Sequence, residues 1–161
     1  MLTHRACALI FLAAALAAAP GPALPVEESG PAGTLAESNP DYARGRKAVE
    51  SRDWGAAIKA FHAAERRDSR NADIQNMLGY AYRNASQLDN AFKHYQRALQ
   101  IDPRHRGAHE YIGEAYLMAG NPAKAEEHLA ILRKICPGAC EEHDDLRKKI
   151  SAYRAGNKKS P

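Results

Sequence analysis

Residues 72–105, ADIQNMLGYAYRNASQLDNAFKHYQRALQIDPRH, decide the fold of this chain of 161 residues. Apolar side chains recur in this stretch at the spacing of an amphipathic helix, in two runs that are separated near Ser86. The pattern predicts a hairpin of two helices, one over about 72–84 and the other over about 87–100. One such hairpin cannot bury its apolar stripe alone, so it must stack against similar units.

The ends of these helices carry their own signals. Asn71 and Ser86 precede the two helices and are predicted to cap them, because a short polar side chain can accept hydrogen bonds from the free N–H groups of a first turn. Asp102 is followed by Pro103, and a residue before proline is held out of the helical conformation, so the second helix should end there. Further along, Asn121 followed by proline predicts the start of another helix.

The same pattern returns on both sides of this stretch after a constant step of about 34 residues, which we call the repeat step. The positions that keep the step are Gly45, Gly79 and Gly113; Ala57, Ala91 and Ala125; Phe61, Tyr95 and Leu129; and Ala64, Ala98 and Leu132. A constant period of this length means that each copy is one structural unit stacked on the next. The copies are predicted at 38–71, 72–105 and 106–139, and the first is the most divergent.

Residues 140–155 follow the third copy and are predicted to form a helix that caps the stack. Leu146, Ile150 and Tyr153 make an apolar stripe, and the first two fall where the repeat places the apolar residues of its first helix. Acidic residues lead the segment and basic residues trail, which suits the dipole of a helix. The chain should therefore hold seven helices, as three pairs and a capping helix.

The second copy resembles the tetratricopeptide repeat, and the resemblance extends over about 102 residues in three copies. The residues that carry it are Leu78, Gly79, Tyr82, Ala91, Tyr95, Ala98 and Pro103. The resemblance implies an all-α fold, a right-handed α-solenoid of helix pairs whose first helices line a concave groove. The whole chain is also similar to the small exported tetratricopeptide proteins of bacteria, in which a cysteine pair precedes an acidic capping helix.

The N-terminus predicts export. Residues 1–23 have the form of a secretory signal peptide, because a short basic start precedes an unbroken apolar run from Cys7 to Ala19. A helix that spans a bilayer needs about 20 apolar residues, so an uncleaved membrane anchor is the less favoured alternative. Residues 24–37 are predicted to be a flexible leader and 156–161 a disordered tail. The mature chain is expected to be periplasmic or secreted, without a transmembrane span.

Charge and motif content exclude several classes of function. The formal net charge is +4 and falls to +3 when Arg5 leaves with the signal peptide. This excess is too small and too dispersed for a nucleic-acid-binding protein. The chain has no glycine-rich phosphate loop, no His-Glu-x-x-His motif and no nucleophile elbow. We therefore expect neither an enzyme nor a bound cofactor.

The strongest candidate for chemistry is the turn that holds Cys136 and Cys140. Removal of the signal peptide would leave these as the two cysteines of the mature chain, and an even count in an exported protein favours one structural disulfide. Two alternatives stay open. A zinc or copper site would use both thiolates and His143, with Glu141 or Asp144 as a fourth ligand. The two thiols could also form a redox-active pair.

The remaining histidines are predicted to be inert. His94 and His128 occupy equivalent positions in adjacent copies and are expected on the solvated outer face of the second helices. The alternative is that these two form a metal-binding or pH-sensing pair. We assign no role to His105 and His109.

The concave groove is where function should reside. In this register the first helices turn the following side chains into it: Tyr42, Arg46, Asn76, Met77, Tyr80, Arg83, Asn84, Glu110, Tyr111, Glu114 and Met118. Tyrosines are favoured at binding hot spots, asparagines can bond the amides of a peptide, and methionines adapt to varied surfaces.

These residues predict a non-catalytic module for protein–protein interaction. We expect an exported adaptor or assembly factor that acts as a monomer and binds a protein or peptide segment in its groove. The alternative is a metal-binding or thiol-redox accessory protein that uses the Cys136–Cys140 turn. Self-assembly through the divergent first copy is the least favoured hypothesis.

Overall fold

The computed structural model describes residues 38–136, 138 and 140–157. These residues form seven α-helices and no strand: α2 (Pro40–Glu50), α3 (Trp54–Arg67), α4 (Ala72–Asn84), α5 (Leu88–Ile101), α6 (Arg106–Met118), α7 (Pro122–Ile135) and α8 (Glu141–Asn157). Within this part of the chain, no helix combines the length and the apolar character that crossing a bilayer requires. The predicted signal peptide and leader lie outside the described residues. The predicted tail was too long at its start, because Gly156 and Asn157 belong to α8, and its remainder, 158–161, also lies outside the described residues.

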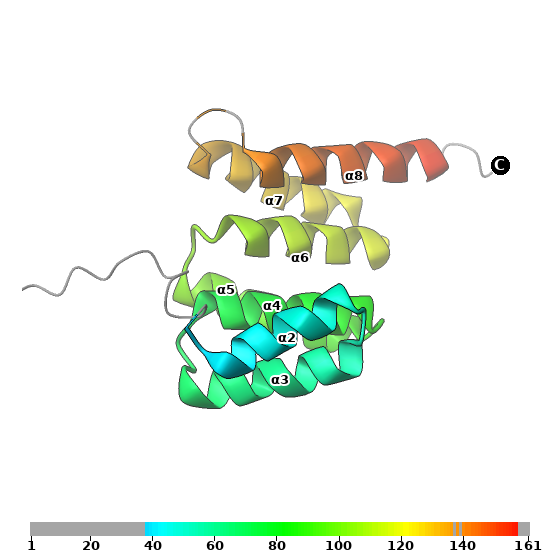
Figure 1. Cartoon of the computed structure of the whole chain (residues 1–161). Helices are drawn as coiled ribbons and strands as arrows, with labels where there is room; N and C mark the ends of the chain where they lie inside the picture. Colours follow the sequence, from blue (N-terminus) through cyan, green and yellow to red (C-terminus); the bar gives the residue numbers. More distant parts are fainter. Residues whose placement is uncertain (1–37, 137, 139, 158–161) are drawn as a thin grey trace, which may run out of the picture.

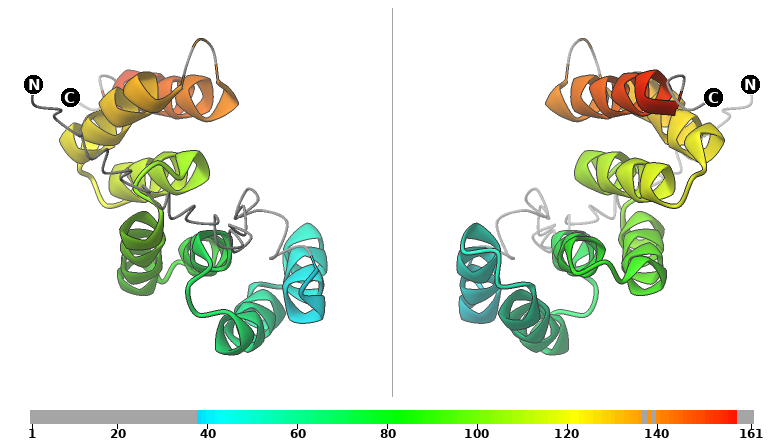
Figure 2. Two further views of the ribbon diagram at one scale, coloured as in Figure 1. Left: turned by 90° about the vertical axis from the view of Figure 1, so that its left-hand side faces the viewer. Right: turned by 90° about the vertical axis from the view of Figure 1, so that its right-hand side faces the viewer.

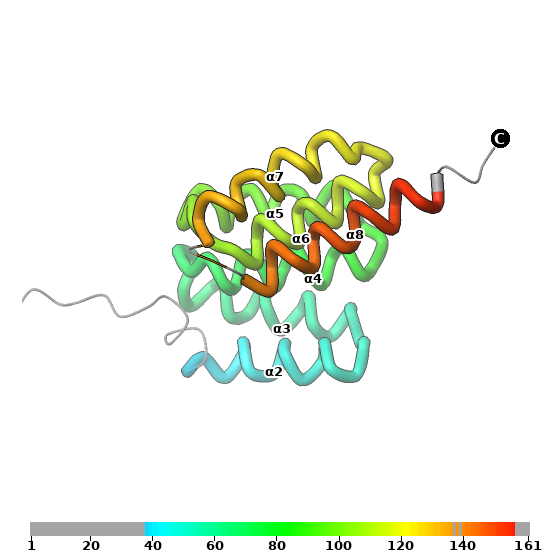
Figure 3. Tube along the Cα trace, turned by 90° about the horizontal axis from the view of Figure 1, so that it is seen from above, coloured from blue at the N-terminus to red at the C-terminus, as the bar shows by residue number. Residues whose placement is uncertain are grey.

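The helices are arranged as a curved stack of antiparallel pairs (Figure 1). Viewed along the helices, α2, α4, α6 and α8 line the concave side of a C-shaped curve, and α3, α5 and α7 form its outer side (Figure 2). The closest packing is within the pairs α2–α3, α4–α5 and α6–α7, while α8 packs on both α6 and α7 (Figure 3). The predicted all-α solenoid of three pairs and a final helix is confirmed.

Most of the predicted helix ends are also found. The side chains of Asn71 and Asn121 cap α4 and α7 by accepting hydrogen bonds from backbone N–H groups, and α5 ends at Ile101 with Asp102 as the residue that follows it. The prediction for Ser86 was wrong. Gln87 is the residue that precedes α5, and its side chain makes no capping hydrogen bond, while Ser86 lies one residue earlier with φ +61°.

The turn inside each pair explains this difference. Arg52, Ser86 and Gly120 are one repeat step apart, and all three have positive φ, at 56°, 61° and 74°. At the second of these turns, the N–H of Ser86 donates to the carbonyl of Arg83 and that of Gln87 donates to the carbonyl of Tyr82. The same two backbone bonds recur at the other turns, which is the Schellman pattern of helix termination. Ser86 therefore ends α4 and does not cap α5.

Glycine lets the helices of a pair approach closely. A Cβ atom on Gly79 would lie 2.5 Å from two ring carbons of Tyr95, and one on Gly45 would overlap the ring of Phe61. Both rings are fully buried. The third copy differs, because a Cβ atom on Gly113 would meet Leu146 of α8. Gly113 therefore allows close packing of α8 on α6, whereas Gly45 and Gly79 allow close packing between the two helices of their own pair.

Candidate functional site

The centre of the concave side is built by α4 and α6 and carries a chain of aromatic rings. Tyr80 of α4 and Tyr111 of α6 have ring centroids 5.1 Å apart at an interplanar angle of 51°. Trp54, the first residue of α3, lies edge-on to Tyr80, with ring centroids 6.1 Å apart. Both tyrosines are half-buried, so they present rigid aromatic surface that a ligand can still reach.

Arg83 holds this aromatic cluster together. Its guanidinium carbon lies 5.4 Å from the ring centroids of both Tyr80 and Tyr111, within the range of a cation–π interaction. The guanidinium also forms an ion pair with Glu114 of α6, and only 8% of Arg83 is exposed. Burial works against the charge on Arg83, but the neighbouring oxygens of Tyr95 and Glu114 outweigh it and hold its pKa above the ordinary value.

Three buried polar atoms in this region have no hydrogen-bond partner among the described residues. They are Oδ1 of Asn76, Nε of Arg83 and the hydroxyl of Tyr95. A buried polar atom without a partner costs roughly 1–3 kcal/mol. The Tyr95 hydroxyl and the Arg83 guanidinium interact with each other, so Oδ1 of Asn76 is the atom to which a ligand would supply a missing bond. Asn76 lies where α4 meets the start of α6, beside Gly107, and it can accept from a peptide N–H there.

A second carboxyl group stands next to the ion pair. Burial, and then the charges of Glu114, Asp145 and Glu142, raise the pKa of Glu110 to about 7. A substantial share of Glu110 is therefore protonated at neutral pH, and in that form it can donate a hydrogen bond to a carbonyl group. The cluster thus combines aromatic surface, a fixed cation, a carboxylate and a carboxyl group of variable charge.

The other predicted groove residues do not add side chains to this cluster. Tyr42 is only 8% exposed and packs on Phe61 in the core. Met77 packs against the same core, and the side-chain amide of Asn84 donates to the carbonyl of Tyr80 in its own helix. Arg46 of α2 and Met118 at the end of α6 are exposed, the latter at 54%.

The structure therefore gathers Tyr80, Arg83, Tyr111 and Glu114 into one cluster, with Glu110 beside it and Asn76 four residues before Tyr80 on α4. We call these six residues the groove cluster. The prediction did not include Trp54, because it lies on a second helix and the register assigns groove positions to first helices. The sequence indicated Trp54 only through its residue type, because it is the one tryptophan of the chain and tryptophan is enriched at binding hot spots.

The prediction that His94 and His128 lie on a solvated face was wrong. Both are half-buried between helix pairs. Tyr82 stacks on His94 with ring centroids 5.3 Å apart, and one repeat step later Tyr116 stacks on His128 at 5.7 Å. The two histidines do not pair with each other, because His94 has His62 and His128 has His109 as its ring neighbour.

The two histidines for which the sequence predicts no role are also held in place. Nδ1 of His105 accepts from the N–H of Ala108 and so caps α6, and its Nε2 lies 3.0 Å from Oδ1 of Asp73. His109 is buried, and its Nδ1 lies 2.9 Å from Nδ1 of His128. The contact of His105 joins the start of α6 to α4, whereas the contact of His109 with His128 joins the two helices of one pair. These histidines therefore contribute to the stack and do not form part of the groove.

The His109–His128 contact predicts acid sensitivity. Nε2 of His109 lies 3.1 Å from the carbonyl of Pro103 and donates to it, so in the neutral ring Nδ1 accepts from Nδ1–H of His128. Burial lowers the pKa of both rings; for His128 burial and then His109 bring the pKa to about 4. The unfolded chain, with ordinary histidines near pH 6.5, therefore takes up protons first as the pH falls.

The free energy of unfolding should accordingly be unaffected by this pair above about pH 7 and should decline between about pH 7 and pH 4. This pair should contribute roughly 1–2 kcal/mol of the loss. Urea unfolding at several pH values measures it. The matched variant is His109→Gln, because Gln75 fills the equivalent position one repeat earlier and bonds His94 at 2.9 Å. This variant should lose less stability in acid, and an unchanged pH dependence would exclude the pair as its source.

The cysteine turn joins α7 to α8. Cys136 and Cys140 are paired in the structure, with their Cα atoms 5.9 Å apart. Glu142 supplies a carboxylate oxygen within 4.8 Å of both sulfur atoms, whereas His143, the predicted third metal ligand, contacts Asp144 at 3.3 Å. A metal would need both sulfurs as free thiolates. The metal alternative therefore concerns the reduced form of this pair.

Comparison with known proteins adds a family match. Two sequence models, both described as tetratricopeptide repeat, match residues 42–105 and 83–150. Human protein O-mannosyl-transferase TMTC3 is 27% identical over 85 residues, which are 53% of this chain and 9% of that protein. The chain thus spans about a tenth of the length of this relative.

Solved structures share the fold. The TPR2B domain of yeast Sti1, in a complex with pHsp70, superposes with a TM-score of 0.64 at 22% identity, over 74% of this chain and 98% of that domain. The type III secretion chaperone SycD of Yersinia enterocolitica, in complex with a peptide of the translocator YopD, has a TM-score of 0.63 at 22% identity, over 82% and 96% of the two chains.

Proposed function

Because this chain belongs to the tetratricopeptide repeat family, we propose that it is a non-catalytic interaction module that binds a segment of another protein across the groove cluster. The observation that carries the proposal is Arg83, a buried cation held between Tyr80 and Tyr111, next to polar atoms that lack partners. A groove that served only as helix surface would have no need of such a cluster, since buried polar groups without partners lower stability.

The geometry favours an extended segment with one apolar or aromatic side chain. Tyr80 and Tyr111 offer the surface on which that side chain would lie. Oδ1 of Asn76 would accept from a backbone N–H, and protonated Glu110 would donate to a backbone carbonyl. Sti1 and SycD, which share the fold, are seen with pHsp70 and with a YopD peptide, and this supports a peptide as the ligand class.

We further propose that the protein is an exported adaptor or assembly factor that acts as a monomer. The support lies in the signal-like residues 1–23 and in the paired Cys136 and Cys140, since disulfides persist in oxidising compartments. In this role the cysteine pair would tie the capping helix to the last repeat. A loop this short stabilises the fold by roughly 2 kcal/mol in the chain-entropy picture.

Site-specific photo-crosslinking tests the groove. A crosslinking residue at position 80 in the producing cell should yield adducts with one dominant foreign protein, whereas the same residue at the exposed Lys93 of α5 should not. A synthetic segment of that protein should then bind the Tyr80→Ala, Tyr111→Ala double variant at least tenfold more weakly than the wild type, because about 1.4 kcal/mol corresponds to tenfold. The Tyr→Phe double variant keeps the rings and is the control. Equal affinity for the wild type and the alanine variant would refute the proposal.

A further inference from the structure

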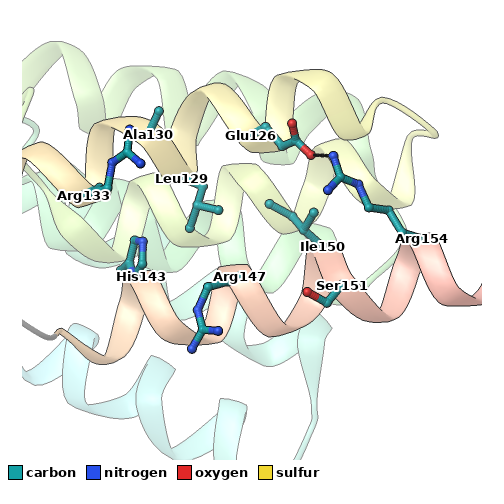
Figure 4. Close-up of a pocket in the computed structure, with 9 residues that line it drawn as sticks. All are labelled: Glu126, Leu129, Ala130, Arg133, His143, Arg147, Ile150, Ser151 and Arg154. Atoms are coloured by element: carbon teal, nitrogen blue, oxygen red, sulfur yellow. Dashed lines mark hydrogen bonds and ion pairs between the residues drawn. The ribbon is translucent and has the colours of Figure 1, made fainter.

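A second surface suitable for binding lies at the C-terminal end of the stack, away from the groove cluster. The antiparallel helices α7 and α8 enclose a depression of about 430 Å³ (Figure 4). Its floor is formed by Leu129, Ala130 and Ile150, and its margins carry Arg133, Arg147 and Arg154. We call this surface the α7–α8 groove.

The repeat step shows what this groove is equivalent to. Ile150 stands one repeat step after Tyr116 of α6, and Tyr116 is covered by α7, where it stacks on His128. Leu117 beside it packs with Ala125 of α7 in one apolar cluster.

Tyr116 also packs on Phe92 of the preceding pair, and Ile150 is likewise buried against α7. Ile150 therefore lies at the edge of the face of α8 on which earlier pairs carry their second helix. Arg147 lies within that face, because the equivalent Gly79 contacts the second helix of its own pair. Among the described residues, α8 packs on α6 and α7, and no further helix follows it in the stack (Figure 1).

The margins of the α7–α8 groove are more basic than the equivalent positions one repeat step earlier. Leu99, Gly113 and Gly120 of the preceding repeat correspond to Arg133, Arg147 and Arg154. Arginines thus stand where the copy one repeat step earlier has apolar or small residues, although Arg52 of the first copy also aligns with Arg154. The apolar centre is kept at Leu129 and Ile150. Glycine at the second position admits a close helix, so Arg147 rules out the tight packing seen inside earlier pairs and calls for a partner with acidic flanks.

The charges in the groove are mainly positive and mostly accessible. Arg133, Arg147 and Arg154 are all exposed. Arg154 forms an ion pair with Glu126, and Arg147 lies 3.3 Å from Asp144, which also contacts His143. Arg133 has no ion-pair partner in the part of the chain that the structure describes. Three arginines therefore face one lining carboxylate, Glu126, across an apolar floor.

We propose that the α7–α8 groove docks an acidic amphipathic helix of a partner protein, in the position that a second helix occupies in the preceding pairs. The helices α7 and α8 lie side by side and form the walls of the groove, with an apolar floor between them. Amphipathic helices bind in hydrophobic grooves of this form. The arginines would bond carboxylates on both flanks of the bound helix, with the planar geometry that suits arginine for carboxylate recognition. This surface is separate from the groove cluster, and its ligand is independent of the one proposed there.

A designed peptide tests the proposal on the full mature chain. The probe is a labelled helical peptide of about 16 residues, with leucines at positions i, i+3, i+4 and i+7 and glutamates on both flanks, and its counterpart carries lysines in place of the glutamates. Fluorescence anisotropy should show saturable binding of the acidic peptide and at least tenfold weaker binding of the basic one. Binding should be unchanged in the Tyr80→Ala, Tyr111→Ala variant, which separates this site from the groove cluster.

Matched charge reversals locate the site. The Arg133→Glu, Arg147→Glu variant should bind the acidic peptide at least tenfold more weakly, and Arg133→Gln, Arg147→Gln should show a smaller loss in the same direction. The control is Lys134→Glu, Lys148→Glu, which makes the same change in charge at exposed neighbours outside the groove. Circular dichroism should show that all variants keep the helical fold, because every replaced side chain is exposed.

Three outcomes would overturn the proposal. If the groove variant and the control variant weakened binding of the acidic peptide equally, the peptide would be attracted by the net charge of the protein alone. Binding to mixed phosphatidylcholine and phosphatidylglycerol vesicles that depends on Arg133 and Arg147, without binding of the peptide, would assign the surface to a lipid membrane. Light scattering would assign the α7–α8 groove to a second copy of this chain if it gave the molar mass of a dimer for the wild type and that of a monomer for the Arg133→Glu, Arg147→Glu variant.

Discussion

Gly79→Ala should destabilise the protein by about 3 kcal/mol, although alanine is the better helix former by about 1 kcal/mol. The added methyl group would lie 2.5 Å from two ring carbons of Tyr95, a separation that real Cβ atoms do not adopt. Tyr95 is fully buried, so its ring cannot move aside without displacing α5. Urea unfolding followed by circular dichroism measures the loss as a fall in the midpoint.

Gly55→Ala is the matched control, since it adds the same methyl group to a helix. The nearest atom to a Cβ on Gly55 is Oδ1 of Asp53 at 3.7 Å, an ordinary contact. This variant should be neutral or gain up to about 0.5 kcal/mol through the lower flexibility of its unfolded chain. If both variants unfolded at the same urea concentration as the wild type, close packing at Gly79 would not be a source of stability.

Glu114→Leu should cost about 3–5 kcal/mol, because it removes one partner of a buried ion pair and leaves the other charge without compensation. The side chains of Arg83 and Glu114 are 9% and 13% exposed, so water cannot replace the lost carboxylate. The cation–π contacts with Tyr80 and Tyr111 remain, but they do not neutralise the guanidinium. Thermal and urea unfolding at pH 7 provide the measurement.

The Arg83→Leu, Glu114→Leu double variant tests the cause. Replacing both partners of a buried pair with apolar residues is often close to neutral, so much of the lost stability should return. Leu117 fills the position equivalent to Arg83 one repeat later, which shows that the fold accepts leucine there. The double variant should still fail to bind the partner segment, since it lacks the cation of the groove cluster. A double variant as unstable as Glu114→Leu would mean that charge compensation is not the function of the pair.

Much of the fold could be predicted, because the repeat step constrains every copy at once. Asn71, Asp102 and Asn121 marked helix ends through local chemistry that tertiary contacts do not override. Ser86 was misassigned because serine is a good N-cap when considered alone. The repeat step aligns it with Gly120, and a glycine in that position indicates a left-handed turn.

The site was predictable in outline only. The register brought Tyr80 and Tyr111 to the groove, but it could not show that Arg83 reaches Glu114, since that contact depends on side-chain conformations across two helices. For the same reason the sequence did not reveal that Tyr82 and Tyr116 cover His94 and His128. A helical period assigns a residue to a face, whereas burial at a junction between repeats depends on the residue that lies opposite.

The stacked arrangement also bears on how quickly the chain folds. Described helices in substantial contact are at most two helices apart along the chain, from α2–α3 at one end to α6–α8 at the other. Neighbouring segments meet with little loss of loop entropy, and domains rich in local contacts fold within microseconds to milliseconds. A chain that leaves a narrow channel with its N-terminus first would add each helix pair to a growing stack without waiting for its far end.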